Sequence, residues 1–383
     1  LDDELSRFIR PNLRRRACCV CPAPRPDSSD VTHPPGACRP PPKKGWLLVD
    51  HAPYQPPNRA RRVLRARLPG LPQKGPFHHT MVANLDVKGL RFMSTEEFRV
   101  LVAAEMGMKN HTIVPMPLIS SLAALKRGGA FKMIKLLAKN KLVQHFSVPY
   151  DGYRLTSKGY DFLALKSFAK RGTLAAMGIQ IGVGKESDIF TVVTPEDREV
   201  CIKLHRLGRT CFRAVKNNRD YTKPGQSVSW IYLSRLSALK EFAFMKALHA
   251  KGFPTPEPID VNRHCVVMSL AHGYVLNSVQ RLTHPAAVFA RLMELIVSLA
   301  EHGLIHGDFN EFNLLIDDDE NVTMIDFPQM VSTSHINAEY YFNRDVNCVR
   351  SFFKRRYGFV AEEWPRLGTD IDRTVASSSL DEE

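Results

Sequence analysis

The sequence predicts an α+β protein in which a small helical domain with a β-hairpin precedes a larger domain of two lobes. Residues 81–172 first show helical periodicity and then a hairpin pattern. Residues 173–268 open with a glycine-bearing strand–turn–strand pattern and form the expected first lobe. The expected second lobe, residues 272–367, carries a long apolar helix followed by the octapeptide HGDFNEFN.

Composition sets the broad class of the chain. Its 383 residues are 44% hydrophobic, which is enough for two or three domains with real cores. No apolar run approaches the roughly 20 residues that span a bilayer, and the opening residues lack a secretory signal pattern. We therefore expect an intracellular, soluble protein without a membrane partner.

Residues 1–80 differ from the rest of the chain. They contain 15 lysines and arginines against 6 acidic residues, and 15 of the 26 prolines. They contain no methionine, and the first in the chain is Met81. This predicts either a disordered basic extension or a translated leader from a mis-set start, with the second slightly favoured. Residues 368–383 read as an acidic tail of a truncated sequence.

The elements of residues 81–172 follow in the order of a winged helix-turn-helix domain. Ser94 and Glu97 have the spacing of a capping box before the first helix. Helical patterns then cover 117–127 and 128–143, a hairpin is expected over 143–156, and a last helix over 157–172.

Basic residues in the third helical pattern suggest contact with nucleic acid. In a winged helix, this helix normally enters a groove and its lysines contact phosphates. The candidates are Lys132, Lys135, Lys139 and Lys141. A solvated face on a domain that binds protein is the alternative, and the pattern does not distinguish RNA from DNA.

The second domain begins with the glycines of GVGKES. Gly182 and Gly184 would let the backbone approach a phosphate closely. The segment lacks the Walker pattern and only approximates the glycine loop of protein kinases. By itself, such a stretch is more often a plain hairpin.

The following elements strengthen the nucleotide hypothesis. Lys203 lies between Ile202 and Leu204 in an apolar strand, as a phosphate-binding lysine does in kinases, and Glu241 on the next helix is its natural partner. Taken singly, Lys203 is more often a lysine at the edge of a sheet and Glu241 more often a residue on a solvated helix face. A buried strand then leads to a glycine-bearing linker whose backbone suits adenine, at Met268, Ser269 and Leu270.

The octapeptide supplies the strongest signal. His306, Asp308 and Asn313 have the H-x-D-x4-N spacing of a kinase catalytic loop, and Asp326 follows after a hairpin. Asp308 would orient the attacking group or accept its proton, while Asn313 and Asp326 would hold magnesium. These elements in the correct order predict phosphoryl transfer from ATP rather than a polar turn.

The residues after Asp326 indicate which kind of phosphoryl-transfer enzyme the sequence predicts. Only 57 residues follow Asp326, and they contain no A-P-E motif. They leave room for one short loop and one or two helices. We therefore expect an ATP site without the activation segment and peptide-binding subdomain of conventional protein kinases.

Together, GVGKESDIF, IHGDFNEFN, IDFPQMVSTSH and the preceding winged helix resemble the RIO family of atypical protein kinases. The resemblance is to the second, winged-helix-bearing subfamily and covers about residues 81–365. It implies a serine/threonine kinase or ATPase that uses ATP and Mg²⁺, with Lys185 and Ser187 also touching phosphate. It further implies that Asp326 transiently carries the phosphoryl group.

The same resemblance implies partners and a location. Family members associate with the pre-40S ribosomal particle, its precursor rRNA and other small-subunit assembly factors in the cytoplasm, and shuttling through the nucleus stays open. The segment 205–230 corresponds to a flexible loop of the family. Its basic residues, which fall within 206–223, suit contact with rRNA or an acidic partner, and a solvated loop is an equal alternative. Ser269 departs from the family, in which an acidic residue is expected at this point of the linker.

Two other functions stay open at this point. A small-molecule phosphotransferase of the aminoglycoside-kinase type also uses H-G-D-x4-N, but it needs a larger region after Asp326 and no winged helix. A nucleotide-bound assembly scaffold without turnover is disfavoured by the intact set of Lys203, Asp308, Asn313 and Asp326.

Overall fold

The computed structural model of the protein describes residues 87–126, 128–207 and 229–368. The expected extension over 1–80, most of the basic segment 206–223 and the expected acidic tail lie outside these residues. None of the helices in the part of the chain that is described has the length and apolar character needed to cross a membrane.

The N-terminal domain contains the predicted helices and hairpin. After the 3-10 helix η1 (Lys88–Phe92), its elements are α2 (Thr95–Gly107), α3 (Met116–Ala123), α4 (Gly129–Lys139), β1 (Val143–Phe146), β2 (Gly152–Leu155) and α5 (Ser157–Arg171). The capping box at the start of α2 is present, because the Glu97 amide donates to the Ser94 hydroxyl and the Ser94 amide donates to the Glu97 carboxylate. The winged-helix order is therefore confirmed.

Within the described residues, the first lobe is a five-stranded antiparallel sheet with the helix α7 (Trp230–Ala250) packed on it. Its strand order is β3-β4-β5-β7-β6. The strands are β3 (Ala176–Val183), β4 (Ser187–Val193), β5 (Glu199–His205), β6 (Pro258–Asn262) and β7 (Cys265–Ser269), and α7 packs on β5, β6 and β7. The sequence pattern did not predict β6.

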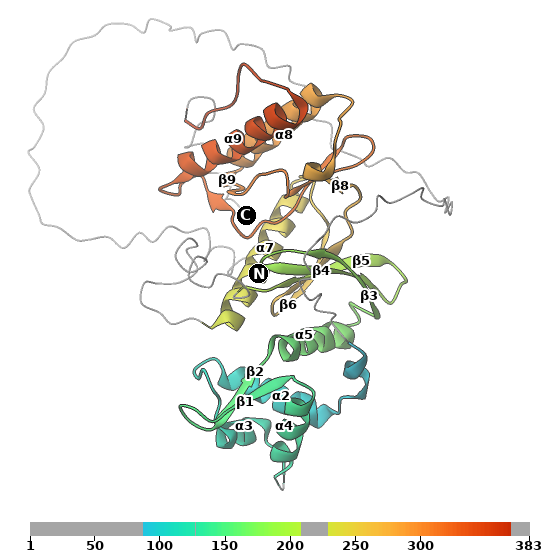
Figure 1. Ribbon diagram of the computed structural model, residues 1–383, viewed down its shortest axis with the longest axis vertical. Coiled ribbons are helices and arrows are strands. Elements are labelled where there is room, and N and C mark those ends of the chain that lie inside the picture. Colours follow the sequence, from blue (N-terminus) through green and yellow to red (C-terminus); the bar gives the residue numbers. More distant parts are fainter. Residues whose placement is uncertain (1–86, 127, 208–228, 369–383) are drawn as a thin grey trace, which may run out of the picture. The chain divides into compact units, whose positions relative to one another are not determined.

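The second lobe is mainly helical, with α8 packed beside α9 (Figure 1). Its elements are β8 (Tyr274–Val275), η2 (Leu276–Ser278), α8 (Pro285–Glu301), β9 (Leu304–Ile305), β10 (Leu314–Ile316), β11 (Val322–Met324), β12 (Val331–Ser332) and α9 (Ala338–Tyr357). The octapeptide lies between β9 and β10. A single helix, α9, follows Asp326 within the described residues, as the short remainder of the chain predicted.

The hydrophobic cores cross the predicted domain boundaries. The sequence pattern places helix α5 in the N-terminal domain, yet Ala164, Leu165 and Phe168 on its second half pack with β4, β5 and β7 of the sheet. On the other face of the sheet, Phe244 and Met245 of α7 share one core with α8 and α9. Because burial of a leucine or phenylalanine side chain contributes about 1.5–3 kcal/mol, Leu165 and Phe168 make α5 part of both domains energetically.

Candidate active site

Lys203 is the centre of the candidate site. It lies on β5 opposite Val266 of β7, and its side chain is 8% exposed. Its ammonium donates to Glu241 Oε1 of α7 at 2.5 Å and to Asp326 Oδ1 at 2.8 Å. The predicted pair of Lys203 and Glu241 is therefore present, and it includes Asp326 from the other lobe.

The charges of these three groups stabilise one another. Burial by itself would lower the pKa of Lys203, but Asp326 and Glu241 outweigh it and raise that pKa. Burial would likewise raise the pKa of Asp326, but Lys203 lowers it to about 2. Burial would raise the pKa of Glu241 too, but Lys203 lowers it. All three side chains are therefore ionised at neutral pH, which a phosphate-binding cation and a metal-binding carboxylate require.

Asp326 directly follows the strand β11 and its neighbour Ile325. Its backbone is left-handed, with φ 69°, a conformation that aspartate tolerates better than most residues. The next residue, Phe327, is fully buried, and its ring lies 5.7 Å from that of His306. Phe327 thus fixes the position of Asp326, whose side chain remains 36% exposed.

The catalytic loop brings Asp308 and Asn313 together. The Asn313 amide nitrogen donates to the Asp308 backbone carbonyl at 2.9 Å and to Oδ2 at 3.1 Å. Two residues that the motif did not single out also hold this carboxylate, since Asn310 donates to Oδ1 at 2.9 Å and Gln329 to Oδ2 at 2.8 Å. Burial, followed by the negative charge of Asp326, raises the pKa of Asp308, which suits a group that accepts a proton.

Asp345 of α9 is a further residue that the motif search missed. Its carboxylate accepts the backbone N–H of Gly307 at 2.7 Å and that of Phe309 at 3.0 Å. The Asp345 carboxylate therefore anchors the backbone of the two residues that flank Asp308. A signal was present in the sequence, because Asp345 falls among Phe342, Val346 and Val349 on the apolar face of the helix, where a charge is unexpected.

Asp345 is expected to make the stability of the protein depend on pH. Burial raises the pKa of its carboxyl to about 6, well above the roughly 3.9 of an exposed aspartate. The folded state therefore favours protonated Asp345, and the contribution of this residue to the free energy of unfolding is complete below about pH 4 and is lost as pH rises through about 6. Between about pH 4 and pH 7, we expect the protein to lose on the order of 2–3 kcal/mol relative to its Asp345→Asn variant. Urea unfolding of both proteins at both pH values measures this, and a constant difference between them would contradict it.

The glycine turn joins β3 to β4. The Gly184 amide donates to the Ser187 carbonyl at 2.7 Å, which closes the turn, and Lys185 is exposed at its tip. A Cβ added at Gly182 or Gly184 would come no closer than 3.4 Å to its neighbours, so the turn itself does not require glycine there. Contact of Gly182, Gly184, Lys185 and Ser187 with phosphate stays a prediction.

The linker between the lobes begins at the end of β7. The backbone of Ser269 is already paired there, because its N–H donates to the Glu257 carbonyl at 2.9 Å, and its hydroxyl accepts the Glu257 N–H at 2.9 Å. Met268 is buried, and Leu270 is partly buried against the core of the second lobe. Adenine binding by Met268, Ser269 and Leu270 stays a prediction, with the Ser269 N–H the least available group.

The predicted nucleic-acid residues are exposed but do not all lie on one helix. Lys132, Lys135 and Lys139 are on α4, while Lys141 follows it in a turn with φ 59°. The Lys135 ammonium lies 4.3 Å from the ring centre of Phe131, which is 49% exposed on the same helix. This surface combines cations with an exposed aromatic ring.

Two oxygen groups in the site fit a magnesium ion. The Asn313 amide oxygen and the Asp326 Oδ2 accept no hydrogen bond from any residue that the structure describes. Magnesium is usually held by one or two such protein oxygens together with substrate phosphates. The residues of the site can thus position a nucleotide triphosphate, hold its metal and orient an attacking group.

Comparison with known proteins agrees with this geometry. A family model described as RIO domain matches residues 188–364, and one described as Rio2, N-terminal matches residues 90–171. The serine/threonine-protein kinase rio2 of Dictyostelium discoideum is 60% identical over 283 residues, which are 74% of this chain and 54% of that protein. The rio2 kinase of Schizosaccharomyces pombe is 48% identical over 78% of this chain and 87% of its own length.

A solved structure shows the same likeness. The crystal structure of the Rio2 kinase–ADP/Mg²⁺–phosphoaspartate complex from Chaetomium thermophilum matches with a TM-score of 0.66 and 48% identity, over 78% of this chain and 90% of that one. The chain spans about half the length of the Dictyostelium relative and of a Caenorhabditis elegans RIO2 relative, at 54% of each. A winged helix joined to a RIO domain, with identity near 50% over most of the chain, shows that this protein belongs to the Rio2 family of serine/threonine-protein kinases.

Proposed function

We propose that this protein transfers the γ-phosphoryl group of ATP in a Mg²⁺-dependent reaction, as a serine/threonine kinase and ATPase. The observation that carries the proposal is the contact of Lys203 with both Glu241 and Asp326, beside the hydrogen-bonded Asp308 and Asn313. This places a cation, two potential metal ligands and a proton acceptor of raised pKa in one site.

The residues have separate roles in this reaction. Lys203 would bind the phosphates of ATP, and Glu241 holds its ammonium in place. Asn313 and Asp326 would hold the magnesium ion, which neutralises charge on the phosphates. Asp308 would orient the attacking hydroxyl or water and accept its proton. Because the related Chaetomium structure contains a phosphoaspartate, we include in the proposal that the Asp326 carboxylate receives the γ-phosphoryl group as ADP leaves. Water would then hydrolyse this acyl phosphate, which releases inorganic phosphate and restores the carboxylate.

ATP turnover by the full chain tests this proposal. We expect release of phosphate that requires Mg²⁺, and protein-bound phosphate that hydroxylamine removes, as an acyl phosphate does. In the Asp308→Asn variant, turnover should fall about 100-fold or more, since a positioned proton acceptor typically contributes 10²–10⁴. Binding of ATP without turnover, even when small-subunit precursors are added, would instead favour a nucleotide-bound scaffold.

We further propose that the protein acts in the cytoplasm on the pre-40S particle and its precursor rRNA, beside other assembly factors. The family resemblance suggests this role, and the exposed lysines of α4 support contact with RNA. Replacing Lys132, Lys135 and Lys139 by glutamine should weaken binding to precursor rRNA. It should also make binding less dependent on salt: the slope of the logarithm of the binding constant against the logarithm of the salt concentration should become shallower by about 0.7 for each phosphate that a lysine no longer neutralises. The same number of replacements at Lys246, Lys251 and Lys354, which are exposed outside the winged helix, is the matched control.

A further inference from the structure

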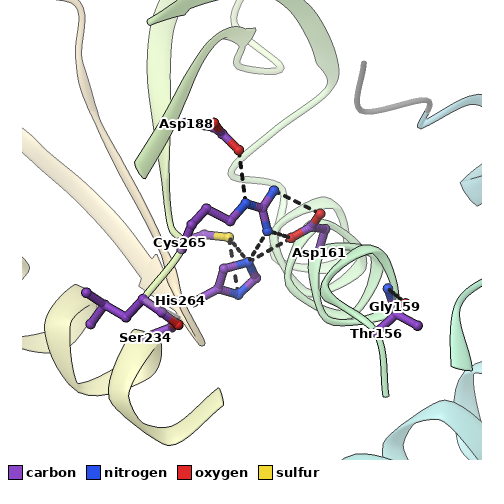
Figure 2. A network of polar contacts seen from close by, with 9 residues as sticks. Thr156, Gly159, Asp161, Asp188, Ser234, His264 and Cys265 are labelled. Carbon is purple, nitrogen blue, oxygen red and sulfur yellow. Dashed lines mark hydrogen bonds and ion pairs between the residues drawn. The ribbon is translucent and has the colours of Figure 1, made fainter. Parts of the chain in front are cut away.

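One buried cation connects the N-terminal domain to the glycine turn. Arg206 follows β5, three residues after Lys203, and its side chain is 10% exposed. Its guanidinium donates to both oxygens of Asp161 on α5, at 2.5 and 3.0 Å. Its Nε donates to Asp188 Oδ2 on β4 at 3.0 Å. Figure 2 shows Asp161 and Asp188 on opposite sides of this network.

The same arginine holds the turn through its backbone. The Arg206 N–H donates to the Glu186 carbonyl at 2.5 Å, inside the turn that Gly184 and Ser187 close. Arg206 thus contacts the residues on both sides of Ser187, Glu186 through its backbone N–H and Asp188 through its side chain. A rotation of this guanidinium would move the part of the turn that is expected to meet the phosphates.

The position of Arg206 depends on Asp161 and its surroundings. The Asp161 carboxylate also lies 2.8 Å from His264 Nε2, and the His264 ring stacks on Tyr160 at 4.4 Å between ring centres. Burial alone would raise the pKa of Asp161, but His264 and Arg206 lower it, so the carboxylate stays ionised. A bidentate pair of this kind fixes the plane of the guanidinium as well as its position.

We propose that Asp161, on the last helix of the winged-helix domain, is a positioning residue for the phosphate-binding turn and acts through Arg206. The winged-helix domain is then part of the nucleotide site and more than a separate binding module. This inference rests on the proposed ATP-dependent function and extends it to a residue outside the RIO domain.

A second ion pair between the domains provides a matched control. Arg263, in the turn between β6 and β7, donates to both oxygens of Glu105 on α2, each at 2.8 Å. This pair is also bidentate, and both side chains are 17% exposed. It makes no contact with the glycine turn in the described part of the chain. Loss of either ion pair should weaken the contact between the domains, but only loss of Asp161 should lower the affinity for nucleotide.

The test compares Asp161→Asn with Glu105→Gln in the full chain. Calorimetric titration with Mg·ADP should show that Asp161→Asn binds about 10-fold more weakly and that Glu105→Gln binds as the unaltered protein does. A loss of about 10-fold is at the lower end of the usual effect of removing a residue that supports a binding group. Hydrogen exchange in the absence of nucleotide should be faster over residues 182–190 in Asp161→Asn alone. Because exchange needs no ligand, it tests the inference even if the protein fails to bind ATP, which would refute the proposed function separately.

Arg206→Lys provides a second route if Asp161→Asn does not fold. Lysine keeps the charge but cannot serve Asp161 and Asp188 in one plane, so it should weaken Mg·ADP binding similarly. Where both single variants fold, the double variant should bind no more weakly than Arg206→Lys alone, since both residues act in one unit. Unchanged exchange and affinity in the single variants, or equal effects of Asp161→Asn and Glu105→Gln, would overturn the inference.

Discussion

Replacing Asp326 by asparagine is expected to lower ATP turnover by about 100- to 1,000-fold and to leave the fold intact. Loss of one preorganised group that stabilises charge in the transition state typically has this effect. The fold should survive because the Asp326 side chain is 36% exposed and Lys203 keeps its buried partner Glu241. Steady-state phosphate release and a urea melt measure the two quantities.

The asparagine variant also separates two roles of Asp326. Asparagine keeps an oxygen for magnesium but cannot form an acyl phosphate, so hydroxylamine-labile phosphate should vanish even where some turnover remains. Asp319→Asn, on the exposed hairpin between β10 and β11, is the control and should behave as the unaltered protein. Labile phosphate that persists in Asp326→Asn would show that another residue receives the phosphoryl group.

Replacing Lys203 by methionine should abolish turnover and also destabilise the protein by about 3–5 kcal/mol. This is the usual cost of removing one partner from a buried ion pair. Here the partner left behind is Glu241, whose side chain is 1% exposed. Asp326 would lose the cation that keeps its pKa near 2, so its protonation in weak acid becomes easier. The free energy of unfolding in urea and the rate of ATP turnover are the measurements.

A double variant distinguishes the structural effect from the catalytic one. Lys203→Met combined with Glu241→Leu replaces both charges by apolar groups, a change that is often neutral for stability. We therefore expect it to recover at least about half of the stability that Lys203→Met removes, since His205 lies 2.6 Å from Glu241 and loses a partner too. Turnover should not recover. Full stability of Lys203→Met alone would contradict the burial of this pair.

Several residues of the site could be identified before the fold was known because their signals are local. The capping box at Ser94 and Glu97 joins residues three apart, and Asp308 and Asn313 meet within one loop. The apolar strand around Lys203 and the motif at Asp326 likewise lie within short stretches of chain. In each case, backbone geometry over a few residues brings the groups together, so their spacing carries the information.

The sequence by itself determined the winged-helix order of the N-terminal domain and the residues of the phosphoryl-transfer motif, whereas β6 of the first lobe left no pattern that predicted it. Only the tertiary structure decided which of these residues touch and which others support them. Lys203 meets Asp326 across 123 positions, Arg206 meets Asp161 across 45, and Asp345 reaches Gly307 across 38. Such contacts depend on how whole helices and sheets pack. The local pattern can mark one residue as unusual, as the charge of Asp345 on an apolar helix face does, but it does not identify the distant partner. For the same reason, the pattern of α5 places it in one domain, although its buried side chains also belong to the core of the next.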